Sequence, residues 1–487
     1  MILKDILNGI EGLKAKGDLE IDIKLITRDS KEAKAGALFV AIKGFETDGH
    51  KYIKEAIENG AVAILVEATA TLKKSDVAED TVIIVAKDTR EALAMVSCNF
   101  YKNPSTKFKL IGVTGTKGKT TTTFMIKTIL EKHGLKVGLI GTIENYIGDK
   151  SLGESCRTTP ESIELQKLFS DMVAEKVDVV VMEVSSQSLK LHRVDGCNFD
   201  VGIFTNFSRD HISEKEHPDT EDYFNSKLKL FDMCKIGYIN ADDFQVAKVK
   251  KLAQNCEIKT YGVDNAADLL AKDITVTNNS VDFKVKLGAI NERIKVGIPG
   301  RFSVYNSLAA ISAISSIGVK SEDIKEALLD IKVPGRSELV PNKKELTIMI
   351  DYSHSPEALQ NILSAVKSYT RGRVITVFGC GGDRDKSKRP IMGEISGTIA
   401  DFSIITSDNP RTEDAETIIK EIEKGISKTK GKYVTIVNRT EAIKYAIKMA
   451  NKNDIIVLAG KGHETYQEIQ GEKIPYDERE VIKKAIG

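Results

Sequence analysis

The sequence predicts an α/β protein that is built mainly on parallel sheets and divided into about three domains. Short β-branched runs alternate with amphipathic stretches along the 487 residues, which is the pattern of repeated βαβ units. At roughly 100–200 residues per domain, this length corresponds to about three domains. With 41% hydrophobic and 29% charged residues, the chain can bury substantial cores and is not disordered.

The predicted elements follow one another in a regular order. Near the start, a helix ending over 53–58 is followed by Gly60 as its stop and by a buried strand over 61–66. Pro and Gly mark two breaks, at 102–105 and at 333–336. Further apolar strands are predicted over 109–113, 177–183, 201–205, 346–351, 373–378, 402–406 and 454–458.

The two breaks define three predicted domains. The N-terminal domain covers 1–103, the central domain 104–334 and the C-terminal domain 335–487. No apolar run approaches the ~18 residues that cross a bilayer, and the first residues lack the apolar core of a signal peptide. We therefore expect a cytoplasmic protein without a membrane insertion.

Charge and cysteine usage argue against several classes of function. Lys and Arg number 71 against 70 Asp and Glu, a net charge of +1, so we expect no nucleic-acid partner and no binding to a membrane surface. The six cysteines are scattered without a C-x-x-C pair, which favours reduced thiols. The seven histidines are too dispersed to predict a zinc cluster.

The sharpest motif is a glycine-rich stretch over 112–121, Gly-Val-Thr-Gly-Thr-Lys-Gly-Lys-Thr-Thr. It lies between the strand predicted over 109–113 and a helix with apolar residues at i, i+3 and i+4, which is the context of a phosphate-binding P-loop. The strict pattern has glycine where this chain has Val113, so the loop is a variant. A Gly-rich turn without a ligand is the alternative.

The residue types in this loop suit a nucleotide triphosphate. Gly115 and Gly118 let backbone N–H groups approach phosphate oxygens, and the following helix N-terminus adds partial positive charge. Lys119 can reach the β- and γ-phosphates, and the Thr120 hydroxyl can bind Mg²⁺. Glu183 ends a predicted strand and could hold Mg²⁺ as well, although a strand-end carboxylate that caps a helix is the alternative.

A series of further motifs runs along most of the chain in a fixed order. Chance could supply one of them, but not the series. They are Gly115-Thr116-Lys117-Gly118-Lys119-Thr120-Thr121, Thr158-Thr159-Pro160, Met182-Glu183-Val184-Ser185-Ser186, Thr205-Asn206, Asp210-His211, Tyr223-Phe224-Asn225-Ser226-Lys227, Tyr305-Asn306, Pro334-Gly335-Arg336, Asp351-Tyr352-Ser353-His354-Ser355-Pro356, Gly379-Cys380-Gly381-Gly382-Asp383-Arg384-Asp385, Asp408-Asn409-Pro410-Arg411 and Gly460-Lys461-Gly462-His463-Glu464. In this order they resemble the Mur ligases, ATP-dependent enzymes that form peptide bonds in peptidoglycan synthesis.

The resemblance implies a three-domain architecture with a central P-loop sheet and a Rossmann-like C-terminal α/β domain. The domains would bind, in order, the UDP end of the substrate, ATP and the incoming amino acid. The implied reaction joins a diamino acid, meso-diaminopimelate, to UDP-N-acetylmuramoyl-L-alanyl-D-glutamate through an acyl phosphate. ATP and Mg²⁺ would be its cofactors, and we expect a monomer.

The resemblance also assigns residues to catalysis, to ATP and to two Mg²⁺ ions. Lys119, Glu183, His211 and Lys227 would be catalytic. Thr120 and Glu183 would hold the first Mg²⁺, and His211 with Lys227 the second; Lys227 would carry a carbamate (N6-carboxylysine), an oxygen ligand suited to Mg²⁺. An unmodified surface lysine is the alternative for Lys227. The implied ATP-binding residues are Gly115, Thr116, Lys117, Gly118, Lys119, Thr120, Thr121, Asn306, Arg336 and Asp351.

A second set of residues matches family positions that hold the UDP-muramoyl-dipeptide. Hydroxyl and guanidinium groups suit phosphate, sugar and carboxylate oxygens. The residue types at Arg157 and Leu191 differ from those usual in the family. The set is Arg28, Ser30, Phe45, Glu46, Thr47, Arg157, Thr158, Thr159, Ser185, Leu191 and Arg193.

The Asp-Asn-Pro-Arg motif bears on which amino acid is added. In the family this form accompanies meso-diaminopimelate, and the Arg411 guanidinium could bind its far carboxylate bidentately. Glu464 would take the distal ammonium and Arg384 the proximal carboxylate. Addition of L-lysine or another diamino acid is the alternative. The implied amino-acid-binding residues are Arg384, Asp408, Asn409, Pro410, Arg411, Gly460 and Glu464.

The chain departs from the family pattern in two places, and two other functions stay open. Gln187 stands where relatives often have His, and Ser213 replaces a second Asp in a charged stretch that runs to Glu216.

An amide ligase similar to folylpolyglutamate synthetase would share the loop but not the C-terminal motifs. A P-loop motor or switch on nucleic acid is a third possibility, which the net charge disfavours.

Overall fold

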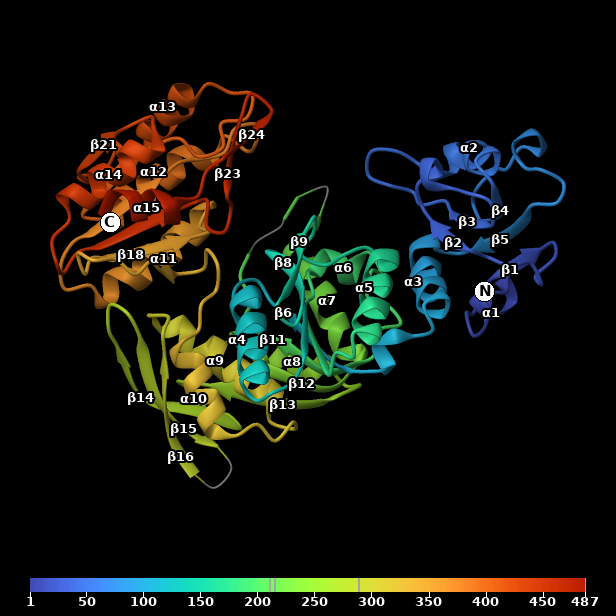
Figure 1. Cartoon of the computed structure of the whole chain (residues 1–487), viewed down its shortest axis with the longest axis horizontal. Coiled ribbons are helices and arrows are strands. Elements are labelled where there is room, and N and C mark those ends of the chain that lie inside the picture. The colour runs from blue at the N-terminus through green and yellow to red at the C-terminus, as the bar shows by residue number, and fades with distance from the viewer. Residues whose placement is uncertain (210–211, 214–215, 288–289, 487) are drawn as a thin grey trace. The chain divides into compact units, whose positions relative to one another are not determined.

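The computed structural model describes residues 1–209, 212, 213, 216–287 and 290–486, which fold into two compact units. The first unit joins Met1–Asp268 with Ala309–Val319, and the second joins Leu269–Leu308 with Lys320–Gly487. Figure 1 shows the elements of each unit. The predicted break at 102–105 leads into a short 3-10 helix (Pro104–Thr106), with Asn103 at a φ of 51°. The break at 333–336 is a loop, with Gly335 at a φ of 65°. The three-domain boundaries stay a prediction.

The first unit begins with a five-stranded sheet. Its elements are α1 (Leu3–Leu7), β1 (Lys14–Lys16), β2 (Leu25–Thr27), β3 (Ala37–Val40), α2 (Ile53–Glu58), β4 (Ala61–Glu67), β5 (Val82–Ala86) and α3 (Thr89–Phe100). The strand order is β1-β5-β4-β3-β2, and all neighbours are parallel except β1 and β5. Gly60 stops α2 with a φ of 109°, as its position predicts.

A larger sheet follows in the same unit. Its elements are β6 (Lys109–Thr114), α4 (Lys119–Lys132), β7 (Val137–Ile140), β8 (Glu144–Ile147), β9 (Lys150–Glu154), α5 (Ser162–Ala174), β10 (Val179–Glu183), α6 (Ser186–Lys190), β11 (Phe199–Phe204), α7 (Thr220–Leu228), β12 (Cys234–Asn240), α8 (Val246–Leu252) and β13 (Glu257–Gly262). The order β13-β12-β11-β6-β10-β7 is parallel throughout, and β8 and β9 extend it as an antiparallel hairpin. The strand before the predicted P-loop, β6, therefore lies between β10 and β11.

The second unit holds the remaining elements. They are β14 (Leu269–Val276), β15 (Val281–Leu287), β16 (Ile290–Val296), α9 (Arg301–Ile314, which continues into the first unit), α10 (Ser321–Leu329), β17 (Glu338–Leu339), β18 (Thr347–Asp351), α11 (Pro356–Tyr369), β19 (Val374–Phe378), α12 (Lys388–Ile399), β20 (Phe402–Ile405), α13 (Ala415–Ile426), β21 (Tyr433–Thr435), α14 (Arg439–Met449), β22 (Ile455–Ala459), β23 (Tyr466–Ile469), β24 (Glu472–Pro475) and α15 (Glu478–Ile486). Strands β14 to β16 are antiparallel. The main sheet has the order β17-β18-β22-β19-β20-β21, parallel from β18 to β21.

This main sheet has a hydrophobic core on each face. One core contains Leu359, Met392 and Ile422 from α11, α12 and α13. The other contains Ile443 from α14 and Ile482 from α15. Helices on both faces of a mostly parallel sheet are the Rossmann-like arrangement that the sequence predicts. The α/β fold is thus confirmed.

The predicted strands are all present, and their ends agree within about two residues, as is usual for pattern-based assignment. The short antiparallel hairpins were not predicted. All five residues of β9 are exposed, so the strand lacks the alternation of buried and exposed side chains on which such a prediction depends. Among the described residues, no helix is both long and apolar enough to cross a bilayer.

Candidate functional site

The predicted P-loop joins the carboxyl end of β6 to the start of α4. Gly115 has a φ of 133°, and a Cβ on it would lie 1.9 Å from the Thr205 hydroxyl, so only glycine fits there. Gly118 has a φ of 86° at the N-terminus of α4. The Lys119 ammonium donates to the carbonyls of Gly115 (2.9 Å) and Thr116 (3.1 Å). The loop therefore has the shape in which backbone N–H groups can meet a phosphate.

The residues that follow β11 fix this loop from the other side. The Thr205 hydroxyl donates to the Lys117 carbonyl at 2.7 Å. Asn206 accepts from the Lys117 N–H at 2.9 Å and donates to the Lys117 carbonyl at 3.0 Å. These bonds hold the backbone of the loop without using the Lys119 side chain.

Glu183 lies at the end of β10, beside the loop, and is buried. Its Oε2 accepts hydrogen bonds from the hydroxyls of Thr120 (3.1 Å) and Thr142 (3.0 Å), and its Oε1 accepts from the Thr142 N–H (2.8 Å). The Thr142 hydroxyl also lies 3.1 Å from that of Thr158. Sequence reasoning missed Thr142. The available indication was its position just after β7, the parallel neighbour of β10.

Lys227 is a buried lysine in contact with the P-loop. Its ammonium donates to the Gly115 carbonyl at 2.9 Å and lies 4.3 Å from the centre of the Tyr223 ring. The Tyr223 hydroxyl in turn donates to the Thr116 hydroxyl at 3.2 Å. The alternative of a surface lysine is therefore wrong. His211, predicted as a metal ligand, lies outside the described residues.

A cavity of about 1090 Å³ in the first unit collects most residues predicted for the UDP-muramoyl-dipeptide. Phe45, on its rim, is 60% exposed. Arg90 and Lys167 also line the cavity and were missed, because single basic residues within helices give no motif. The predicted residues that line it are Arg28, Ser30, Phe45, Glu46, Thr47, Arg157, Leu191 and Arg193. Thr158, Thr159 and Ser185 do not line it, and Gln187 and Glu216, from the two departures, do.

The buried Thr159 bonds to the segment that follows β10. The Thr159 hydroxyl donates to the Glu183 carbonyl at 2.8 Å and accepts from the Ser185 N–H at 3.1 Å. Ser185 caps α6 by accepting from the Ser188 N–H. The buried Arg193 pairs with Glu161 at 2.9 Å. The Thr159 bonds therefore tie residue 159 to the end of β10, which carries the metal candidate Glu183.

In the second unit, predicted ATP-binding residues meet at the carboxyl end of β18. The Asp351 carboxylate accepts from the Ser337 N–H at 2.8 Å. The Arg336 guanidinium lies 4.8 Å from the Tyr352 ring, and its Nε has no hydrogen-bond partner among the described residues. Burial raises the pKa of Tyr352 to about 12, so its hydroxyl is protonated at neutral pH. Asn306 is buried in α9.

The predicted amino-acid-binding motifs meet at the carboxyl ends of β19, β20 and β22. The Asn409 side chain donates to Glu464 Oε2 at 2.8 Å and accepts from the Lys461 ammonium at 3.0 Å. Lys461 is fully buried and also donates to Glu464 at 3.1 Å. A Cβ on Gly460 would lie 2.5 Å from Asp408 Oδ2, an oxygen without a hydrogen-bond partner among the described residues. The motifs thus pack on one another.

Arg411 and Arg384 lie on the loops beside this cluster. Arg411 has a φ of 52°, which is unusual for a residue other than glycine. A Cβ on Gly382 would lie 1.9 Å from the Pro410 carbonyl oxygen, so the Gly-Gly loop packs directly on residues 409–411. Arg384 is in the exposed part of that loop. Lys461 contacts Asn409 and Glu464. It belongs to the Gly-Lys-Gly-His-Glu motif, but it was not predicted to bind the amino acid.

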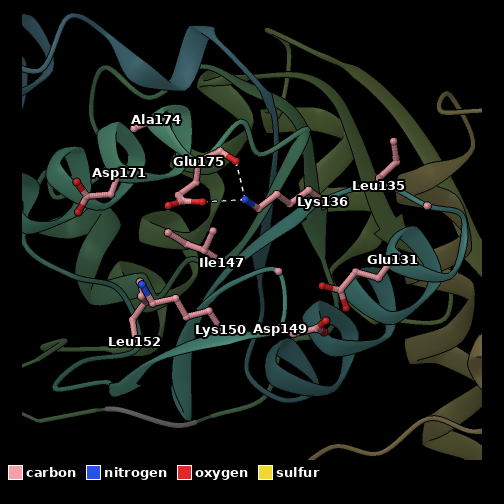
Figure 2. A pocket seen from close by; sticks show the side chains of 12 residues that line it. Glu131, Leu135, Lys136, Ile147, Asp149, Lys150, Leu152, Asp171, Ala174 and Glu175 are labelled. Carbon is pink, nitrogen blue, oxygen red and sulfur yellow. Dashed lines mark hydrogen bonds and ion pairs between the residues drawn. The ribbon is translucent and has the colours of Figure 1, made fainter.

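A second cavity of about 800 Å³ lies between the ends of α4 and α5 and the hairpin of β8 and β9. Figure 2 shows Lys136 paired with Glu175, at 2.9 Å, along its wall. Glu131 and Asp149 lie near each other on another side. None of the residues that line it is among the predicted site residues.

Comparisons with known proteins extend along the chain. The sequence matches the Mur ligase middle domain over 113–314, the Mur ligase, glutamate ligase domain over 335–462 and the catalytic domain of the Mur ligase family over 22–101. It is similar to several curated proteins, and to a solved structure, that carry the name UDP-N-acetylmuramoyl-L-alanyl-D-glutamate--2,6-diaminopimelate ligase. The protein of that name from Caldanaerobacter subterraneus subsp. tengcongensis is 48% identical over 489 residues, which cover 100% of this chain and 99% of that protein.

Two further similarities agree with this one. The protein of the same name from Clostridium botulinum (strain ATCC 19397 / Type A) is 49% identical over 468 residues, 96% of this chain and 95% of that protein. A solved structure of a ligase with this name superimposes with a TM-score of 0.73 at 28% identity, and the match covers 100% of this chain and 98% of that one.

Proposed function

The chain belongs to the Mur ligase family, and we propose that it adds meso-diaminopimelate to UDP-N-acetylmuramoyl-L-alanyl-D-glutamate in an ATP-dependent step of peptidoglycan synthesis. The observation that carries the proposal is the full-length similarity to ligases of this name, with Arg411 in place. The enzyme is an ATP-dependent acid–amino-acid ligase. A cytoplasmic location and a monomeric state stay predictions.

The chemistry explains why cationic and oxygen-rich groups gather around the P-loop. A carboxylate is a poor acyl donor, and transfer of the γ-phosphoryl group of ATP to it gives an acyl phosphate that an amine can attack. The carboxylate and the γ-phosphate are both anionic and must be held close together. The Lys119 ammonium, which bonds to the Gly115 carbonyl, can supply opposing charge at this place. Lys227 bonds to the same carbonyl and, as a carbamate, would offer Mg²⁺ an oxygen ligand there.

The donors at the end of β10 fit Mg²⁺. The Thr120 hydroxyl and the buried Glu183 carboxylate are 3.1 Å apart, and both are oxygen ligands of the kind that Mg²⁺ prefers. When bound, Mg²⁺ would neutralise charge on the transferring phosphoryl group. Burial of Lys227 in contact with the loop supports its role in catalysis. A ¹³C-bicarbonate NMR signal that is absent in Lys227→Ala would establish the carbamate.

The geometry also supports the roles proposed for the other residues. The residues that line the cavity of about 1090 Å³ would hold the UDP-muramoyl-dipeptide, because Arg28, Arg157 and Arg193 line it together with exposed Phe45, and guanidinium groups suit phosphate and carboxylate oxygens. In the second unit, Arg336 and Asp351 would contact ATP. Residues Asp408 to Arg411, with Gly460 and Glu464, would hold the diamino acid, and Arg384 would meet its proximal carboxylate.

Product analysis tests this function directly. The enzyme is given ATP, UDP-N-acetylmuramoyl-L-alanyl-D-glutamate and equal amounts of meso-diaminopimelate and L-lysine, and the mass of the product is measured by mass spectrometry. We expect the diaminopimelate product, and phosphate release that needs both the muramoyl-dipeptide and the amino acid. A lysine product would overturn the assignment of the amino acid. Phosphate release that depends on folate or nucleic acid would overturn the ligase assignment.

A further inference from the structure

Residues 408–411 are held by the hairpin of β23 and β24, which none of the predicted motifs includes. Gln467, on β23, donates through its side chain to the Asp408 carbonyl at 2.9 Å. The Glu468 N–H donates to Asn409 Oδ1 at 3.0 Å. The hairpin thus contacts both polar residues that precede Pro410, and the family similarity over 335–462 ends just before it.

The same strand fixes the backbone of Arg411. The Arg411 N–H donates to the Glu468 carbonyl at 2.9 Å, and the Gln470 N–H donates to the Arg411 carbonyl at 2.7 Å. These two bonds flank a residue whose φ of 52° is costly for a side chain with a Cβ. Without the strand, we expect the Arg411 backbone to relax, because these two bonds would no longer offset that cost.

The Arg411 side chain is oriented by two acceptors. Its Nε donates to Glu468 Oε2 at 2.9 Å, and its NH1 donates to the Gly382 carbonyl at 2.7 Å. A guanidinium has five N–H groups, and among the described residues these two bonds leave three of them, including both on NH2, for a further acceptor. Such N–H groups can pair with the oxygens of a carboxylate. Arg411 is 20% exposed, so a ligand can reach it.

We propose that Glu468 is a positioning residue that determines specificity for the incoming amino acid. It orients the Arg411 guanidinium so that its remaining N–H groups meet the carboxylate at the far end of meso-diaminopimelate. The inference rests on the proposed function, since lysine has no carboxylate there and gains nothing from an oriented Arg411. Glu468 therefore contributes to the binding of the diamino diacid and not to that of lysine.

Steady-state kinetics of Glu468 variants test this proposal. In Glu468→Ala, the loss of a hydrogen bond to a charged group should raise the KM for meso-diaminopimelate about tenfold or more. The KM values for ATP and for the muramoyl-dipeptide, and kcat, should change little. Glu468→Gln retains an acceptor oxygen for Nε and should stay close to the wild type. Glu472→Ala, at an exposed position of the same hairpin, is the matched control.

Two additional variants separate positioning from a general structural effect. Glu468→Asp, whose carboxylate is one methylene shorter, should show the same rise in KM even if Glu468→Ala fails to fold. In an Arg411→Ala background, Glu468→Ala should have no further effect on the KM for diaminopimelate, because its only proposed action is through Arg411. Additive effects of the two substitutions would overturn the proposal, as would a parallel rise in the KM values of all three substrates.

The failure of this inference differs from failure of the proposed function. A wild-type enzyme that adds meso-diaminopimelate, together with Glu468→Ala and Glu468→Asp variants that keep its KM, would overturn only the role of Glu468. A wild-type enzyme that does not discriminate diaminopimelate from lysine would overturn the assignment of the amino acid and this inference with it.

Discussion

The Thr120 hydroxyl donates a hydrogen bond to the Glu183 carboxylate over 3.1 Å, although 63 positions separate the two residues in the sequence. Thr120 lies in the first turn of α4, and Glu183 ends β10, the parallel neighbour of β6. The contact joins the phosphate-binding loop to the proposed metal ligand.

Replacing the P-loop lysine should abolish most activity. Lys119→Ala removes the ammonium that we expect on the β- and γ-phosphates, and turnover should fall at least ~10²-fold, as when one donor to a transition state is lost. Phosphate release under saturating substrates measures this change. Lys107→Ala, at an exposed position before β6, should behave as the wild type. Near-full activity of Lys119→Ala would refute its assignment.

Replacing the carboxylate of Glu183 should change the response to Mg²⁺. Glu183→Gln keeps an oxygen that accepts from Thr142 but loses the charge that attracts the ion. The Mg²⁺ concentration for half-maximal activity should rise about tenfold or more, because changes to the groups around a bound metal typically lower its affinity by that factor. A Mg²⁺ titration of phosphate release measures it, with Glu154→Gln on exposed β9 as the control. An unchanged titration midpoint would exclude Glu183 as a ligand.

Replacing Arg411 should alter the choice of amino acid more than the rate of the enzyme. Arg411→Ala removes the guanidinium proposed for the far carboxylate, so kcat/KM for meso-diaminopimelate should fall about tenfold or more, and that for lysine should not. The ratio of the two products in a competition reaction measures the effect. Arg371→Ala, an exposed arginine before β19, is the control. Equal losses for both amino acids would contradict the carboxylate contact.

The ion pair of Arg389 and Glu413 should make stability depend on acid pH. Arg389 is fully buried, and its hydrogen bonds to Glu413 are the largest cause that lowers the pKa of that carboxyl from its usual 4.5 to about 2, with smaller contributions from the Asp383 N–H and Lys386. A folded-state pKa below the unfolded value stabilises the protein above pH 4.5, and this contribution is lost as the pH falls toward 2. The difference in unfolding free energy between the wild type and Glu413→Gln should therefore shrink over that range.

Denaturant unfolding at several pH values measures this difference. Glu416→Gln, at an exposed position of α13, serves as the control, since it should shift stability little at any of these pH values. A wild-type advantage over Glu413→Gln that stays constant from pH 5 to pH 2 would mean that the ion pair does not set the acid response.

The α/β class, the buried strands and the P-loop could be predicted from the sequence alone. Those features depend on local patterns: β-branched runs form strands, and a glycine-rich stretch between a strand and a helix is the local signature of a phosphate-binding loop. The family motifs likewise named Arg411, Glu464 and Lys227 as candidates. A resemblance assigns roles only to residues that match known family positions, so it gave no role to Lys461 or Thr142.

Which groups those residues contact depends on how distant segments pack in the folded chain. Because β7 and β10 pair in parallel, Thr142 after β7 lies within hydrogen-bond distance of Glu183 at the end of β10. Lys227, which the sequence alone could place on the surface, is buried and bonds to the Gly115 carbonyl. Glu468 lies on a short, mostly exposed hairpin that carries no pattern, yet it bonds to Arg411 across 57 positions. Pairings between distant segments depend on chain topology and packing, which no local pattern in the sequence encodes.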